Sequence, residues 1–478
     1  MTVNLTDPTP QDLRALFDLQ RAARWDIARS TPKDRVRTLR RLRAAIIARR
    51  DDLTRAIHAD FGKARLESEV TEIHHVIAEI DHATRHLRRW TAPHPVPGTP
   101  ELLGSRSWVQ SEPLGQVLIL SPWNYPFGLL MAPLVAAIAA GNVVTLRPSE
   151  KVPHTARALQ ELIGAVFHPA HAALVTGDVP VADALLDLPF DHVFFTGSTA
   201  VGRKVATRAA AHLASVTLEL GGKSPTLLLP DADPTLAGQR TGWAKFLNAG
   251  QTCVAPDHAW VPPELETPFV DAARTYLRGA YGEGHAAQRS PDYARLIDRP
   301  ALDRLLGLID DARTHGATLA TGGQTDPADR FLAPTILTGV TPDMAIMQEE
   351  LFGPVLPVLR ARPDEAMTWI RERPKPLALY VYSRSGAAAR DVLSRTSAGT
   401  SVINHGFIHM IHPHLPFGGT GQSGTGQYHG HSGFRTLSHE RAVLHQRRWS
   451  PTDLLRPPYA RPGVQRLWQA RRRLDDRR

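Results

Sequence analysis

The first clear pattern in the chain is a stripe of apolar residues at three- and four-residue steps, which is typical of an amphipathic helix. Thr31 can cap such a helix with its hydroxyl group, and Pro32 suits its first turn. The stripe consists of Val36, Leu39, Ile46, Ile47, Leu53 and Ile57. Because the opposite face carries mainly Arg and Asp, the pattern predicts a surface helix that packs on a core and continues to Ile57.

A second apolar stripe predicts another amphipathic helix over residues 69–90. Four prolines and a glycine then occur within residues 91–100, and this composition excludes a helix there. We therefore expect an extended connector or arm to follow the N-terminal helices.

From Pro113 onward, short apolar runs alternate with helical segments. The apolar runs cover residues 116–121, 142–148, 172–177, 192–198 and 215–222. This alternation predicts an α/β fold with a parallel sheet covered by helices on both faces, and ligands bind such sheets at the carboxyl ends of the strands. Four polar or special residues lie at or just after strand ends, namely Asn124, Arg147, Gly197 and Glu219. Their positions predict one shared site.

Residues 129–146 form an apolar run that is about long enough to cross a bilayer. Pro133 and the pair Gly141-Asn142 interrupt it. A buried helix, a tight break and a buried strand explain the run better, so we expect no integral membrane segment.

The chain has 478 residues, which favours two or three domains, and 42% of them are hydrophobic, enough for full-sized cores. Its one cysteine excludes intramolecular disulfides and fits the cytoplasm. The net charge of +9 is spread along the chain, with dense basic patches in residues 35–50 and 446–478. We interpret these as a solvated, Arg-rich surface and a basic tail, and we do not expect nucleic-acid binding.

Cys253 follows a small, polar, glycine-containing approach over residues 248–252. Such a turn leaves backbone N–H groups free near the sulfur, where they can stabilise an anion. The thiol is therefore a candidate nucleophile, and the alternative is an inert buried cysteine.

Glu219 lies between two leucines at the end of an apolar strand. One interpretation is a carboxylate that points from the strand edge into water. The other is a partly buried general base whose pKa is raised by burial, which suits the activation of water near neutral pH.

Residues 197–204 (GSTAVGRK) have glycines at phosphate-loop spacing but lack the Lys-Ser/Thr ending, which argues against a kinase or ATPase. The segment still follows a strand and opens a helix, so its N–H groups can hold a pyrophosphate. Six histidines gather near the C-terminus: His405, His409, His412, His414, His429 and His431. No Cys and no H-E-x-x-H pair accompany them, and we interpret them as loop polarity and expect no metal site.

Several longer motifs carry a family resemblance. They occupy residues 112–127, 136–150, 194–205, 216–225, 245–257, 333–337, 348–358, 375–380 and 415–430. In these motifs the chain resembles the aldehyde dehydrogenases, and within them the class 3 branch of fatty and aromatic aldehyde dehydrogenases. The resemblance implies NAD(P)-dependent oxidation of medium- or long-chain aliphatic, or aromatic, aldehydes to carboxylic acids.

The family fold that the resemblance implies is α/β. A Rossmann-type cofactor domain would use residues 1–90 and 113–218, and an α/β catalytic domain would use residues 219–400. A bridging, oligomerising arm would use residues 91–112 and 401–445, followed by the basic tail, 446–478. A homodimer is expected.

The resemblance also implies residue roles. Cys253 corresponds to the nucleophile, Glu219 to the base for deacylation, and Asn124 to the side-chain half of the oxyanion hole. The cofactor-binding positions are Trp123, Arg147, Glu150, Gly197, Ser198, Val201, Leu220, Glu350 and Phe352. Tyr125 and His75 correspond to substrate-lining positions, although class 3 members place an aromatic residue at the latter.

One departure bears on the cofactor. The family usually has Lys where this chain has Arg147, and a forked guanidinium suits a 2′-phosphate. Glu150 would repel that phosphate, so we expect NAD, with NADP possible.

Two other functions are consistent with such a fold. Acyl transfer to coenzyme A would need no base at Glu219, and a non-catalytic binding protein would need neither Cys253 nor Asn124. The presence of all three residues argues against both.

Overall fold

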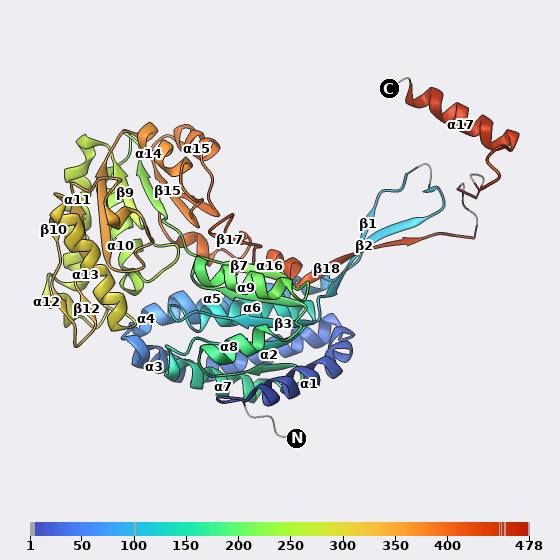
Figure 1. Ribbon diagram of the computed structural model, residues 1–478, viewed down its shortest axis with the longest axis horizontal. Coiled ribbons are helices and arrows are strands. Elements are labelled where there is room, and N and C mark those ends of the chain that lie inside the picture. Colours follow the sequence, from blue (N-terminus) through green and yellow to red (C-terminus); the bar gives the residue numbers. More distant parts are fainter. Residues whose placement is uncertain (1–4, 100–101, 449, 451, 454–455, 477–478) are drawn as a thin grey trace.

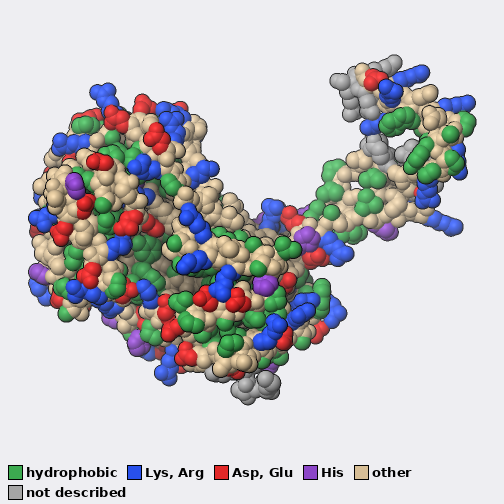
Figure 2. Space-filling view, in the orientation of Figure 1, with side chains coloured by type: hydrophobic (Ala, Val, Ile, Leu, Met, Phe, Trp, Pro, Cys, Tyr) green, Lys and Arg blue, Asp and Glu red, His purple; other side chains and the backbone are tan. Residues whose placement is uncertain are grey.

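The computed structural model describes residues 5–99, 102–448, 450, 452–453 and 456–476. Two α/β sheets with their helices form the body of the molecule, and a narrow sheet projects from it (Figure 1). Basic side chains are scattered over the visible face and along the projecting part, in keeping with a solvated surface (Figure 2).

The first large sheet has six strands in the order β17-β7-β6-β3-β4-β5, and all are parallel except β17. They are β3 (Gln116–Leu120), β4 (Val143–Arg147), β5 (Ala172–Leu174), β6 (His192–Thr196), β7 (Ser215–Glu219) and β17 (Gly424–Thr425). β3, β4 and β6 are buried along their whole length, as expected for strands covered on both faces. All five apolar runs predicted to be strands are confirmed.

Helices connect these strands in the predicted alternation. They are α6 (Gly128–Ala140), α7 (Pro153–Val166), α8 (Val179–Leu186) and α9 (Thr199–Ala210). Every residue of α6 is buried, and the helix ends at Gly141, whose φ of 95° favours glycine. The buried helix, break and strand predicted over residues 129–146 are confirmed. In the described ranges, no helix combines the length and apolarity needed to cross a membrane.

The N-terminal region packs helices against this sheet. They are α1 (Pro10–Ala28), α2 (Pro32–Ala48), α3 (Arg50–Phe61), α4 (Arg65–Ser68), the π-helix η1 (Glu69–Ile73) and α5 (His74–Trp90). Thr31 caps α2 as predicted, because its hydroxyl accepts from Asp34 N–H at 3.3 Å and the Asp34 carboxylate accepts from Thr31 N–H at 3.1 Å.

The expectation of one helix from Pro32 to Ile57 was wrong. The chain turns at Arg49, where φ is −107°, so the apolar stripe is divided between α2 and α3. Leu53 and Ile57 reach the core from the second axis, and Ile47 at the end of the first is 42% exposed. The stripe kept its period across the turn because both helices face the same core.

The second large sheet has seven strands in the order β10-β13-β14-β9-β8-β15-β16, and β10 alone is antiparallel to its neighbour. They are β8 (Pro225–Leu228), β9 (His258–Val261), β10 (Thr318–Thr321), β13 (Thr335–Thr338), β14 (Val355–Arg360), β15 (Ala378–Tyr382) and β16 (Thr400–Ile403). A short hairpin, β11 (Thr325–Asp326) and β12 (Phe331–Leu332), lies outside it.

The second unit also contains helices and short helical turns, and the first two of these lead to the cysteine. They are α10 (Pro234–Phe246), the 3₁₀ turn η3 (Leu247–Gly250), α11 (Pro263–Tyr281), α12 (His285–Gln288), α13 (Arg299–Thr314), the 3₁₀ turn η4 (Ala345–Met347), α14 (Pro363–Arg371) and α15 (Gly386–Arg395). Strand β8 directly follows the loop after β7, so the chain passes from one sheet to the other just beyond Glu219.

The projecting sheet has three antiparallel strands, β1 (His94–Val96), β2 (Arg106–Pro113) and β18 (Ser438–His445). Beyond it the chain ends in helix α17 (Pro462–Asp475), which lies away from the body (Figure 1). The segment 401–445 is divided between sheets: β16 and β17 lie in the two larger sheets, and β18 lies in the arm. The turn η5 (Ile408–Ile411) lies between β16 and β17, and helix α16 (Gly430–Thr436) lies between β17 and β18.

Candidate active site

The approach to Cys253 has a backbone that few sequences adopt. Residues 248–250 have φ angles of 53°, 50° and 73°, all in the left-handed region. The turn is held from outside, because Asn248 N–H donates to Glu67 Oε1 at 2.8 Å. It is also held from inside, because Gln251 Nε2 donates to the Asn248 carbonyl at 3.0 Å. These bonds fix the position from which Cys253 leaves the turn.

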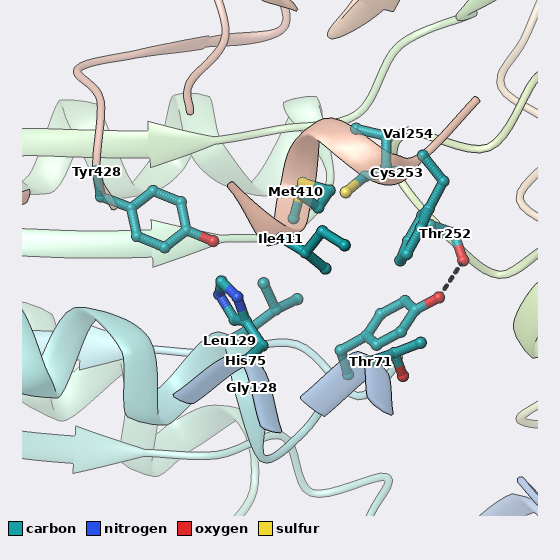
Figure 3. A pocket seen from close by; sticks show the side chains of 12 residues that line it. Thr71, His75, Gly128, Leu129, Thr252, Cys253, Val254, Met410, Ile411 and Tyr428 are labelled. Carbon is teal, nitrogen blue, oxygen red and sulfur yellow. Dashed lines mark hydrogen bonds between the residues drawn. The ribbon is translucent and has the colours of Figure 1, made fainter. Parts of the chain in front are cut away.

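The Cys253 sulfur points into a mostly apolar pocket that α5, α6, the turn η5 and the cysteine loop surround (Figure 3). The pocket is lined by Thr71, His75, Tyr125, Gly128, Leu129, Thr252, Cys253, Val254, Phe407, Met410, Ile411 and Tyr428. His75 and the Tyr428 hydroxyl lie across this space from the sulfur (Figure 3). The pocket therefore joins an apolar binding surface to one nucleophilic atom.

The loop after β3 is tied directly to the cysteine loop. Asn124 Nδ2 donates to the Gln251 carbonyl at 3.1 Å, and Asn248 Nδ2 donates to the Asn124 carbonyl at 2.8 Å. The hydroxyls of Tyr125 and Thr252 are 2.7 Å apart (Figure 3). Asn124 is thus buried, and one of its two amide hydrogens is engaged by Gln251, which lies two positions before Cys253 in the sequence.

A buried ion pair supports the same loop from below. Lys63 Nζ lies 2.8 Å from Glu72 Oε1, and both side chains are fully buried. The other Glu72 oxygen accepts from the N–H groups of Phe127 and Gly128, at 2.9 and 3.1 Å. Lys63 Nζ also lies 3.7 Å from the centre of the Tyr125 ring, a favourable cation–π distance. The sequence analysis missed this pair, and its signal was a carboxylate on the apolar face of the predicted helix.

Glu219 ends β7 with its side chain buried. Within the part of the chain that the structure describes, neither carboxylate oxygen has a hydrogen-bond partner. Burial alone raises the pKa of this carboxyl well above its usual value. The solvent-edge interpretation of Glu219 is therefore wrong.

The environment of the thiol favours its protonated form. Burial raises the pKa of Cys253 to about 12, and the carboxylates of Glu350 and Glu219 act in the same direction. The N–H groups of Cys253 and Val254 act in the opposite direction, because they donate toward the sulfur.

A groove between the two sheets begins at the start of α9. Ser198 caps this helix, and its hydroxyl accepts from Val201 N–H at 3.4 Å. Gly197 directly precedes it, and Val201 is 44% exposed beside it. Leu220 is buried, and a Cβ at Gly202 would overlap it. A helix start with free N–H groups fits a pyrophosphate.

Opposite this helix, Glu350 packs on the glycine pair that follows Glu219. A side chain at Gly221 would overlap the Glu350 carboxylate, so the close approach requires glycine. Burial raises the pKa of Glu350 to about 8, while the N–H of Gly222 lowers it. Phe352 has a φ of 46° and meets Trp123 edge to face at 5.4 Å. Residues of both sheets thus converge on this groove.

Arg147 and Glu150 lie at the carboxyl end of β4, beside a surface pocket that includes Glu150. Arg147 Nη2 is 2.8 Å from Glu150 Oε2 and donates to the Gly177 carbonyl at 2.8 Å. The guanidinium is therefore engaged by the protein itself.

Two further lysines near the groove were missed. Lys223 pairs with Asp257 and donates to the Glu349 carbonyl at 2.9 Å. Lys245 is fully buried, and its ammonium has no hydrogen-bond partner among the described residues. Burial lowers the pKa of Lys245 to about 8. Its signal in the sequence was a lysine directly before Phe246 at the end of a helix.

The six histidines that were predicted to be polar loop residues differ in how deeply they are buried. His429 is buried and His409 is partly buried, whereas His412 and His414 are exposed. His429 packs beside His75 of α5, with ring centres 4.8 Å apart.

Together, the fold and this arrangement define a class of protein: a dinucleotide-binding α/β enzyme with a cysteine in an apolar pocket. The aldehyde dehydrogenase family model matches residues 2–443, and the chain belongs to the aldehyde dehydrogenase family. It oxidises aldehydes with a nicotinamide dinucleotide, which confirms the enzyme class, α/β fold and NAD(P) cofactor expected from the sequence.

Individual relatives agree with this assignment. The chain is 38% identical to the 4,4'-diaponeurosporen-aldehyde dehydrogenase of Staphylococcus aureus, over 96% of this chain and 97% of the relative. It is 40% identical to the dimeric NADP-preferring aldehyde dehydrogenase of Rattus norvegicus, over 88% and 94%. A solved structure titled "Substrate bound state of Staphylococcus Aureus AldH" superposes with a TM-score of 0.91 at 37% identity, over 96% and 99% of the two chains.

Proposed function

We propose that Cys253 attacks the aldehyde, that Asn124 and the Cys253 N–H hold the resulting oxyanion, and that Glu219 activates the water that releases the acid. One observation carries this assignment: the Glu219 carboxylate is buried without a hydrogen-bond partner among the described residues, and its charge acts on the Cys253 thiol. An unpaired buried carboxylate is costly, and such groups concentrate at sites where the chemistry uses them.

The steps follow from the side chains. The Cys253 thiol first loses its proton to solvent. The thiolate sulfur then bonds to the carbonyl carbon, and the carbonyl electron pair moves to oxygen, where two N–H donors stabilise the charge. When bound, the nicotinamide dinucleotide supplies the acceptor for the aldehyde hydrogen and its two electrons. Glu219 then takes a proton from water as the water oxygen attacks the thioester carbon. The carbon–sulfur bond breaks, and the thiolate leaves with the carboxylic acid formed.

We assign the cofactor to the groove between the sheets and the pocket at the end of β4. The proposed contacts are Trp123, Arg147, Glu150, Gly197, Ser198, Val201, Leu220, Glu350 and Phe352. The start of α9 is suited to the pyrophosphate. Because Glu150 and the Gly177 carbonyl already engage Arg147, we propose that NAD is preferred and NADP tolerated.

The preferred substrate is a medium- or long-chain aliphatic, or an aromatic, aldehyde. The pocket supports this, because Leu129, Phe407, Met410 and Ile411 present carbon surface next to the sulfur. Tyr125 and His75 line the same space and are the proposed substrate contacts.

We further propose a homodimer in the cytoplasm. The projecting sheet of β1, β2 and β18 buries little against its own body and offers a surface for a second subunit (Figure 1). In this scheme residues 1–90 and 113–218 bind the cofactor, 219–400 carry the chemistry, and 91–112 with 401–445 bridge subunits, with 446–478 as a basic tail. A single cysteine is compatible with a reducing compartment.

The test is product analysis with a panel of aliphatic and aromatic aldehydes, assayed with NAD and with NADP, in the presence and absence of coenzyme A. We expect free carboxylic acid in stoichiometric amount with reduced cofactor, whether or not coenzyme A is present. Formation of an acyl-coenzyme A product would contradict the role of Glu219.

A further inference from the structure

Three potential metal ligands from distant parts of the chain meet beside the substrate pocket. His75 and Glu79 lie one turn apart on α5, and His429 directly precedes α16. One ligand atom from each lies within 4.8 Å of the other two, and they form the one such group in the described ranges. His429 lies more than three hundred positions after His75 and Glu79, so no local sequence motif predicts this group.

These side chains are buried without matching partners. His429 is 3% exposed, and neither ring nitrogen has a hydrogen-bond partner among the residues described. Glu79 is 5% exposed; Oε2 accepts from Gly430 N–H at 2.8 Å, and Oε1 has no partner in the same part of the chain. Buried polar atoms are nearly always satisfied, so this concentration of unpartnered atoms points to an absent ligand, and a cation suits the lone pairs of the imidazoles and the carboxylate.

We propose that His75, Glu79 and His429 bind a divalent transition-metal ion of the Zn²⁺ type. Two imidazoles and one carboxylate are a donor set that zinc uses, and three protein ligands leave a fourth position open. His75 lines the pocket that contains Cys253, so this fourth position is accessible from the substrate side.

The geometry requires a modest adjustment. Ligand atoms around a tetrahedral zinc ion are about 3.4 Å apart, given bonds of about 2.1 Å. Because the ligand atoms lie within 4.8 Å of one another, the most distant pair must approach by up to about 1.4 Å. His75 is the member with room to move, because it is partly exposed to the pocket while Glu79 and His429 are held in the packed interior.

Two other groups could bind zinc and must be distinguished from this one. The first is the Cys253 thiol in the same pocket. The second is a cluster of imidazoles from α5 and from the loop after η5. The ring centres of His86 and His414 each lie 4.4 Å from that of His82 and 6.1 Å from each other. Each alternative has a variant that removes it.

The experiment is calorimetric titration of the metal-stripped full-length protein with Zn²⁺, followed by Co²⁺ absorption spectroscopy to report coordination. We expect His75→Phe and Glu79→Gln each to weaken the tightest site by at least ~10-fold, since even supporting residues of metal sites have effects of this size. The matched control His74→Phe changes the adjacent, exposed histidine and should leave the site intact.

Cys253→Ala and His86→Ala should also retain the tightest site and the Co²⁺ spectrum. Because binding is read in Cys253→Ala, the result does not depend on the proposed catalytic roles. Unchanged Zn²⁺ affinity in folded His75→Phe and Glu79→Gln would overturn the proposal, as would loss of the tightest site in Cys253→Ala or His86→Ala. Circular dichroism of each variant checks that it is folded.

Discussion

Two glutamates at this site, Glu72 and Glu219, are both buried, but only Glu72 has partners for its carboxylate. Glu72, on η1, is 0% exposed, and its carboxylate forms an ion pair with Lys63 and accepts from two backbone N–H groups. Glu219, at the end of β7, is 2% exposed and has no partner among the residues that the structure describes.

The difference separates support from chemistry. A carboxylate whose hydrogen bonds are satisfied fixes its neighbours, so Glu72 positions the loop that carries Asn124 and Tyr125. An unsatisfied one has a raised pKa and a free lone pair, so Glu219 is able to accept a proton from water. Burial alone does not identify a catalytic residue, whereas burial without partners does point to one.

The largest expected effect is that of removing the nucleophile. Cys253→Ala should reduce aldehyde oxidation by at least ~10⁴-fold, because no other group can form the thioester. Steady-state production of reduced cofactor measures this. The unfolding midpoint should change little, and a folded variant that kept substantial activity would remove Cys253 from the mechanism.

Glu219→Gln should lower steady turnover by about 10²–10⁴-fold, the usual contribution of a general base. A single burst of reduced cofactor should remain, since the first half-reaction does not need this base. Stability should be unchanged or higher, because an uncompensated carboxyl is removed. An undiminished steady rate would mean that another base acts.

Glu72→Gln should show the reverse balance. It leaves Lys63 buried without its counter-charge, which should destabilise the fold by about 3–5 kcal/mol. Urea unfolding measures this. Turnover should fall less than in Glu219→Gln, and both half-reactions should slow together because the loop loses its support. Equal stability of the two variants would contradict the comparison.

The pH dependence should follow the same logic. The thiol pKa is raised to about 12 and that of Glu219 is raised by burial, so both reactive forms gain population as pH rises. We expect kcat/KM to rise with pH through the neutral range, by up to about tenfold per pH unit while a required group is mostly protonated. A profile that falls across this range would contradict the assigned protonation states.

The smallest expected effect concerns the cofactor. Arg147→Lys keeps the charge but replaces the guanidinium, whose Nη2 engages both Glu150 and the Gly177 carbonyl. We expect the ratio of NADP to NAD efficiency to fall about three- to tenfold, because guanidinium suits a phosphate better than ammonium does. An unchanged ratio would mean that Arg147 does not contribute to cofactor choice.

The local features of the fold were predictable because their causes are local. The cap at Thr31, the end of α6 at Gly141 and the buried strands each depend on residues a few positions apart. The turn at Arg49 was not predictable from periodicity, because the helices on its two sides face one core.

The site residues also fall into those that local sequence predicts and those that only tertiary packing relates. Cys253 and Glu219 stood out because each lies in an unusual local sequence. The pairing of Lys63 with Glu72 escaped notice because Glu72 gains its meaning from N–H groups 55 and 56 positions later. His75 and His429 meet only through tertiary packing, so their relation could not be read from a histidine-rich segment.

The most direct test of the account is the intact mass of Glu219→Gln after mixing with NAD and a medium-chain aldehyde. We predict a stable mass increase equal to one acyl group, mapped to Cys253 by peptide sequencing and absent from the double variant with Cys253→Ala. No adduct despite a burst of reduced cofactor, or an adduct on any other residue, would contradict the pairing of this thiol with this carboxylate.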